Sequence, residues 1–212
     1  CGDGLSEIFK GIGADYLIEG GQTMNPSTED MLNAIKKVNA DHIFILPNNK
    51  NIIMAANQAA ELVEDKKIVV IPSKSVPQCI SAMVEFNDKK SAEANEKAMN
   101  KAIGRVTSGQ LTYAVRDTEI DGIEIKKDDI LGMVEGKIVT VGKDIDDVLN
   151  RVVSQMVDED TEFLNVYYGK EIKKPQADVM LKALETKYAD DEIEVSFKKG
   201  GQPLYYYIIS AE

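Results

Sequence analysis

The feature that most constrains the fold is a pair of short, dense apolar runs, each closed by a proline. Residues 42–46 end at Pro47 and residues 67–71 end at Pro72, and an amphipathic stretch follows each run. Dense Val/Ile/Leu runs are typical of strands buried on both faces of a parallel sheet, and a 3.6-residue apolar period is typical of crossover helices. The first half of the chain is therefore predicted to be α/β with a parallel sheet.

Periodicity and turn residues extend this prediction along the chain. Ser27 and Asp30 have capping-box spacing, and Asn49 is placed to cap the helix that follows it. Composition changes near residues 104–109, so we predict a parallel α/β subdomain over 1–105 and a smaller α+β subdomain over 106–212. In the first we expect helices over 5–12, 27–38, 49–63, 76–84 and 91–103, and strands over 15–18, 42–46 and 67–71. In the second we expect strands over 111–115, 123–125, 130–134, 137–141, 162–167, 192–197 and 204–209, and helices over 145–156 and 176–188.

Charge and residue counts exclude several classes of function. The chain carries 25 Lys and Arg against 36 Asp and Glu, which argues against sequence-independent binding to nucleic acid. The excess of acidic over basic side chains is concentrated in residues 106–212, where 13 basic and 22 acidic side chains leave a net charge of −9. A solvated acidic surface and a docking face for a basic partner both explain this concentration.

Cysteine and histidine are too scarce for several kinds of site. Cys1, Cys79 and His42 are three potential ligands, one fewer than a closed Cys/His zinc site needs. Two cysteines in 212 residues indicate a reducing compartment, and we expect a cytoplasmic protein. The apolar runs are too short for a membrane span.

Polar loops lie where an open parallel sheet places its ligands, beyond the carboxyl ends of the strands. Gly2-Asp3-Gly4 precedes a helix and is either a weak G-x-G signal or a tight turn. Residues 20–28 form either an anion-receiving helix start or a long turn with an N-cap, and residues 47–51 form an Asn-rich cluster. Residues 200–207 combine two glycines with three tyrosines. If they continue into a strand, Tyr205 and Tyr207 share one face, which indicates either strand packing or an aromatic contact patch.

Five segments carry a family resemblance. They are residues 2–9 (GDGLSEIF), 19–30 (EGGQTMNPSTED), 46–52 (LPNNKNI), 113–118 (YAVRDT) and 200–205 (GGQPLY). Together they resemble the C-terminal part of the ATP-using A component of bacterial fatty acid kinase, which belongs to a dihydroxyacetone-kinase-like family. The resemblance covers essentially the whole chain and implies a DegV-like fold for the first domain. It also implies that the chain is a fragment of a longer protein whose ATP-binding kinase domain lies upstream.

The comparison with DegV-like fatty-acid-binding proteins extends to single loops. Gln22, Pro26 and Ser27 are similar to their first ligand loop, although extra residues separate Gln from Pro. Asn48, Asn49 and Lys50 stand where their second loop has Ser and Gly to hold a fatty-acid head group. Asn and Lys fill the space in which a carboxylate approaches backbone N–H groups. This departure indicates a carrier-like fold that is used for docking.

The resemblance implies a non-catalytic domain that docks a fatty-acid-binding, DegV-like partner subunit. It implies no cofactor in this fragment, with ATP and Mg²⁺ belonging to the kinase domain, and a possible homodimer through the parent protein. Two alternatives stay open: a DegV-like module for a fatty acid or other small ligand, and an enzyme acting on a phosphorylated small molecule through residues 2–6 and 22–28. We predict no catalytic or metal-binding residue. The partner- or ligand-facing residues that we predict are Gly2, Asp3, Gly4, Gln22, Thr23, Asn25, Ser27, Asn48, Asn49, Lys50 and Tyr205.

Overall fold

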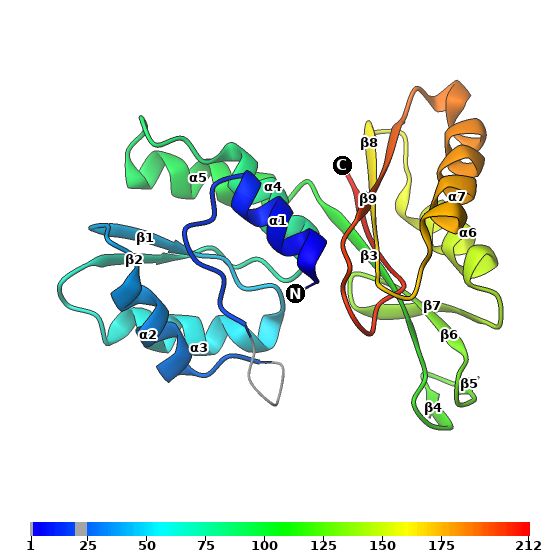
Figure 1. The fold of residues 1–212 in the computed structure, drawn as a ribbon, viewed down its shortest axis with the longest axis horizontal. Coiled ribbons are helices and arrows are strands. Elements are labelled where there is room, and N and C mark those ends of the chain that lie inside the picture. The colour runs from blue at the N-terminus through cyan, green and yellow to red at the C-terminus, as the bar shows by residue number, and fades with distance from the viewer. Residues whose placement is uncertain (1, 20–24) are drawn as a thin grey trace. The chain divides into compact units, whose positions relative to one another are not determined.

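The computed structural model describes residues 2–19 and 25–212, which form two compact units (Figure 1). The N-terminal unit is Ile8–Val106, and the C-terminal unit combines residues 2–7 with Thr107–Glu212. Helix α1 (Asp3–Gly11) begins in the C-terminal unit and ends in the N-terminal one. The chain therefore contributes to the C-terminal unit twice, at its start and in its second half.

A parallel strand pair organises the N-terminal unit. Strands β1 (His42–Ile45) and β2 (Lys67–Val70) pair in register from His42 opposite Lys67 to Ile45 opposite Val70. The predicted parallel pairing is confirmed for these strands. Helices α2 (Thr28–Lys37) and α3 (Lys50–Glu61) lie on one side of the pair, and α4 (Val76–Glu85) and α5 (Ala92–Ile103) lie on the other (Figure 1).

The alternation of side chains along β1 and β2 divides the interior of this unit into two cores. Ile43 and Val70 face a cluster formed with α2 and α3, whose buried members include Met31, Ile52 and Ala56. Phe44 on β1 and Val69 on β2 point to the opposite face and join a second cluster, formed with α4 and α5. Its buried members are Val69, Ile71, Ala82 and Met99, and Phe44, Leu46 and Ile103 pack against it. Both strand faces are apolar because both are covered by helices.

The strand predicted over residues 15–18 is wrong. These residues have no strand geometry, and Asp15 and Tyr16 are exposed. Ile18 packs against the α2–α3 core, and the Tyr16 hydroxyl accepts a hydrogen bond from Lys37 Nζ at 3.1 Å. Within the described residues this segment pairs with no strand, and without ladder hydrogen bonds it stays irregular.

The C-terminal unit is built on a mixed sheet. In the described residues the sheet has six strands, in the order β7-β6-β3-β10-β8-β9. Neighbours are antiparallel except β8 and β9, which run parallel. The bounds are β3 (Thr107–Tyr113), β6 (Ile130–Val134), β7 (Lys137–Gly142), β8 (Phe163–Tyr168), β9 (Glu194–Lys199) and β10 (Tyr207–Ala211).

Helices α6 (Ile145–Met156) and α7 (Lys174–Lys187) cover this sheet (Figure 1). α6 packs on β3, β6 and β7, and α7 packs on β9. Their apolar stripes share one core with the sheet, which includes Leu111, Leu149, Val152, Leu164 and Leu184. The predicted α+β character of this half is therefore observed.

Two turns join neighbouring strands by left-handed residues. Glu135 (φ 50°) and Gly136 (φ 77°) connect β6 to β7 in a hairpin turn. Asp121 (φ 52°) and Gly122 (φ 79°) connect β4 (Thr118–Ile120) to β5 (Ile123–Ile125) in a small separate hairpin. β4 was not predicted, because its three residues are exposed and carry no burial alternation.

Candidate functional site

The two polar loops of the N-terminal unit meet at a pair of asparagines. Asn25 precedes α2 and Asn49 precedes α3, and Asn49 Nδ2 donates to Asn25 Oδ1 at 3.2 Å. The structure thus brings together two predicted residues, Asn25 and Asn49, and the predicted Ser27 and Asn48 lie near them in the sequence. Gln22 and Thr23, which we also predicted here, lie outside the described residues.

Asn49 is the N-cap of α3, as predicted. Its Oδ1 accepts from the backbone N–H groups of Asn51 at 2.9 Å and Ile52 at 3.3 Å. The N–H groups at a helix start are those that an anion would use. Asn49 therefore occupies the donors that a carboxylate ligand would need at this position.

The start of α2 is also capped by a side chain of its own loop. Ser27 Oγ accepts from Asp30 N at 3.1 Å, and the Asp30 carboxylate accepts from Ser27 N at 2.8 Å, which completes the predicted capping box. The backbone hydrogen bond from Ser27 holds the pKa of Asp30 below its usual value. A negative charge therefore already stands at this helix start, and it disfavours a second anion.

Two buried side chains, Ser73 and Cys79, hold the start of the 47–51 loop by hydrogen bonds. The Pro47 carbonyl accepts from Ser73 Oγ at 2.6 Å and from Cys79 Sγ at 3.2 Å. Burial raises the pKa of the Cys79 thiol to about 12, so the thiol stays protonated and unreactive. Asn48 and Lys50 are exposed on this loop and make no side-chain hydrogen bond or ion pair within the described residues.

In the C-terminal unit, the predicted Gly2-Asp3-Gly4 segment packs against the predicted glycine loop after β9. Leu5 N donates to the Gly200 carbonyl at 2.9 Å. A side chain at Gly2 would overlap the backbone of Gly201, and one at Gly4 would overlap the Lys199 carbonyl oxygen. Close backbone approach therefore explains both glycines, and Asp3 stays exposed beside them.

The tyrosine segment is arranged differently from the predicted strand. Tyr205 N donates to the Pro203 carbonyl at 2.8 Å, so the chain still turns there, and β10 begins only at Tyr207. Tyr207 is fully buried, and among the described residues its hydroxyl has no hydrogen-bond partner. Tyr205 and Tyr206 are half-buried and directly precede β10.

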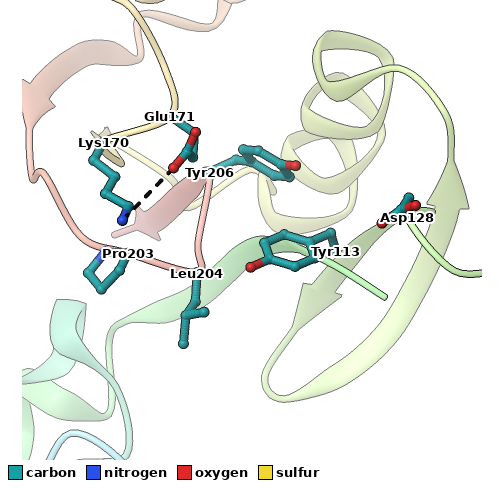
Figure 2. Close-up of a pocket in the computed structure, with 7 residues that line it drawn as sticks. All are labelled: Tyr113, Asp128, Lys170, Glu171, Pro203, Leu204 and Tyr206. Atoms are coloured by element: carbon teal, nitrogen blue, oxygen red, sulfur yellow. Dashed lines mark ion pairs between the residues drawn. The ribbon is translucent and has the colours of Figure 1, made fainter. Parts of the chain in front are cut away.

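Tyr206 contributes to a hollow of about 350 Å³ in the C-terminal unit (Figure 2). The Tyr206 and Tyr113 ring centroids are 5.9 Å apart with a 56° interplanar angle. Desolvation, with smaller Coulombic effects from Tyr113, Glu171 and Asp128, raises the pKa of Tyr206. The full lining is Tyr113, Asp128, Lys170, Glu171, Pro203, Leu204 and Tyr206.

A smaller hollow of about 220 Å³ lies in the N-terminal unit, beside the start of β1. Its lining includes His42, Phe44, Phe86 and Asp88. Residues 2–19 and 25–212 contain no group of three or more His, Cys, Asp or Glu side chains arranged to hold a metal ion. In the same residues, no helix combines the length and apolarity that a membrane crossing requires.

The sequence profile of the FakA-like C-terminal family, whose members are related to the A component of fatty acid kinase, matches residues 1–212. The chain belongs to this family. Over 211 residues it is 51% identical to protein YloV of Bacillus subtilis (strain 168), a match that covers 100% of the chain and 38% of YloV. This fatty acid kinase-related chain thus spans less than two fifths of the length of that relative.

Solved structures share the fold of the FakA-like domain at low sequence identity. The DegV family protein Cg2579 from Corynebacterium glutamicum has a TM-score of 0.64 and 12% identity, over 97% of this chain and 91% of that one. The Streptococcus pneumoniae fatty acid kinase (Fak) B3 protein, solved loaded with linoleic acid, has a TM-score of 0.60 and 13% identity, over 88% of this chain and 76% of that one. The chain therefore has a DegV-like fold, and this fold extends beyond the first domain in which the resemblance implied it.

Sequence reasoning missed most of the tyrosine hollow of this FakA-like domain. Of its lining, only the segment 203–206 fell in a region that we singled out as a loop. Tyr113 stands in the YAVRDT segment that carries the family resemblance, and this was the available signal. Asp128, Lys170 and Glu171 carried no signal, because single charged residues in turns are ordinary.

Proposed function

We propose that this chain is the non-catalytic C-terminal domain of a fatty acid kinase, and that it docks the fatty-acid-binding partner subunit. In the proposed reaction, a carboxylate oxygen of the fatty acid attacks the γ-phosphorus of ATP and the bond to the β-phosphate oxygen breaks. The products are acyl phosphate and ADP. ATP and Mg²⁺ would bind to a kinase domain outside this chain, and docking would supply the proximity on which phosphoryl transfer depends.

The observation that carries the proposal is the closure of both helix starts in a DegV-like fold. Asn49 Oδ1 accepts from Asn51 N and Ile52 N at the start of α3, and Ser27 Oγ accepts from Asp30 N at the start of α2, where the Asp30 carboxylate adds a negative charge. A fatty-acid carboxylate would have to displace Asn49 or approach the Asp30 carboxylate, and both changes are unfavourable. Family membership together with these closed loops supports a protein partner over a bound lipid.

Docking can be measured by isothermal titration calorimetry. The 212-residue chain is titrated with the fatty-acid-loaded DegV-family protein of the same organism, and the full-length kinase serves as the positive control. We expect both to bind with similar affinity. Binding by the full-length kinase without binding by the chain would contradict the proposal.

The second candidate function is a fatty-acid-binding module, because the fold is shared with proteins such as Fak B3. Native mass spectrometry of the purified chain separates the two functions. Docking predicts a mass equal to that of the polypeptide alone. A stoichiometric adduct with the mass of a long-chain fatty acid would favour the second function.

A further inference from the structure

The backbone around the hollow of Tyr113 and Tyr206 is held in place by hydrogen bonds within the unit. Tyr206 N donates to the Leu111 carbonyl at 2.9 Å, and the Tyr206 carbonyl accepts from Gly169 N at 2.8 Å. Lys170 N donates to the Gln202 carbonyl at 3.1 Å. Each wall is therefore anchored by the backbone, which reduces the ordering cost of binding.

Two residues of the lining have left-handed backbones, and the strain is greater at Leu204 because Asp adopts this region more readily. Asp128 (φ 68°) and Leu204 (φ 69°) both lie in the left-handed region, which is uncommon for residues other than glycine. Asp128 N donates to the Ala114 carbonyl at 2.8 Å, and the Leu204 carbonyl accepts from Thr112 Oγ1 at 2.7 Å. Strain of this kind concentrates at ligand sites, where the surroundings hold a side chain in a required place.

The charges and rings of the hollow favour a cation. In Figure 2 the two tyrosine rings lie between Lys170 and Glu171 on one side and Asp128 on the other. The two carboxylates outnumber the single ammonium, and Lys170 Nζ lies 4.0 Å from Glu171 with both side chains about 60% exposed. Tyrosine faces carry negative potential that attracts a guanidinium group, and a planar guanidinium also stacks on them.

The hollow belongs to the strongly acidic part of the chain. Residues 106–212 have a net charge of −9, so a basic partner surface would be steered toward this unit. Leu204, 40% exposed, and Pro203 add an apolar rim on which the stem of a long side chain can rest.

We propose that this hollow binds an arginine side chain presented by a partner protein, with the guanidinium over the tyrosine rings and between Asp128 and Glu171. Lys170 opposes this binding by partly neutralising Glu171. The proposal stands apart from the identity of the partner, because it depends only on the lining residues.

The test uses N-acetyl-arginine amide as the probe and N-acetyl-citrulline amide as its uncharged isostere. The 212-residue chain carries ¹³C-labelled tyrosine, and each probe is titrated while the ring resonances of Tyr113 and Tyr206 are followed by NMR. We expect saturable shifts of both rings with the arginine probe and weaker binding of the citrulline probe. Equal responses to the two probes, or unmoved rings, would overturn the proposal.

Charge variants give the sign of each contribution. Asp128→Asn, which tolerates the left-handed backbone, and Glu171→Gln should each weaken arginine binding by about twofold to fivefold. Lys170→Gln should tighten it by about twofold. Glu185→Gln on the exposed side of α7 is the matched control and should leave the affinity unchanged.

Tighter binding on Lys170→Gln is the decisive result, because a merely structural lysine would not produce it. Weaker binding on that substitution would mean that Lys170 contacts the probe, and would overturn the assignment of a cation. No partner protein enters these titrations, so their failure leaves the docking proposal to its own calorimetric test.

Discussion

The 47–51 loop of the N-terminal unit and the tyrosine hollow of the C-terminal unit use their polar groups in opposite ways. In the loop, Asn49 caps α3 and binds Asn25, and Pro47 is held by Ser73 and Cys79. In the hollow, tyrosine rings and carboxylates line open space above a backbone that is anchored by hydrogen bonds. A cluster of polar residues in the sequence therefore indicates internal capping as readily as a binding site, and only the hydrogen-bond partners distinguish the two.

A large expected effect at fixed pH tests the close contact between the Gly4 backbone and the Lys199 carbonyl. Gly4→Ala places a methyl group against the Lys199 carbonyl, and because a backbone oxygen cannot move aside, we expect a loss of about 3 kcal/mol in unfolding free energy. Gly11→Ala on the same helix has open space and should be neutral or stabilising by up to about 1 kcal/mol. Urea unfolding monitored by circular dichroism measures both. Equal losses would show that the contact is not specific.

The buried thiol beneath the 47–51 loop gives a pH-dependent prediction. The pKa of Cys79 is raised from 9.0 to about 12 by burial, so the unfolded chain ionises first and binds fewer protons above pH 9. Stability should therefore fall between pH 9 and pH 12, by up to about 1.4 kcal/mol per pH unit from this group.

The matched variant for this prediction is Cys79→Ala, which shares every other titrating group. Its unfolding free energy should fall less steeply with pH than that of the wild type, whatever its value at neutral pH. Parallel slopes would mean that the thiol is not held protonated beneath the loop.

The loop itself is tested by two neighbouring asparagines. Asn49→Ala removes the cap of α3 and should destabilise the unit by about 1 kcal/mol. Asn48→Ala removes an exposed side chain and should change stability by less than about 0.5 kcal/mol. Thermal unfolding compares the two variants. A larger loss of stability for Asn48→Ala than for Asn49→Ala would show that capping by Asn49 is not what holds the loop.

The smallest expected effect concerns the strained rim of the hollow. Leu204→Gly relieves the left-handed backbone at φ 69° and should stabilise the chain by about 0.5–1 kcal/mol. Leu204→Ala keeps the strain and should bring no such gain. If both variants behave alike in urea unfolding, backbone strain is not stored at this rim.

Local elements could be predicted from the sequence where periodicity and turn chemistry agreed. The 145–156 helix and the 130–134 strand match the structure at both ends, because Asp144 caps the first and a left-handed turn closes the second. The strand over 15–18 failed because an apolar run needs a neighbouring strand, which local pattern cannot reveal. The hollow could not be predicted because it joins residues near positions 113, 128, 170 and 204, which only the strand order brings together.

Strand β10 lies between β3 and β8, although it follows every other described strand in the sequence. During synthesis, the β3-β6-β7 and β8-β9 portions can each form early, but they stay separate until residues 207–211 leave the ribosome. Until then both portions expose open edges that can pair with other nascent chains. Assembly of the hollow is correspondingly late, since Tyr206 reaches Tyr113 only when β10 is inserted.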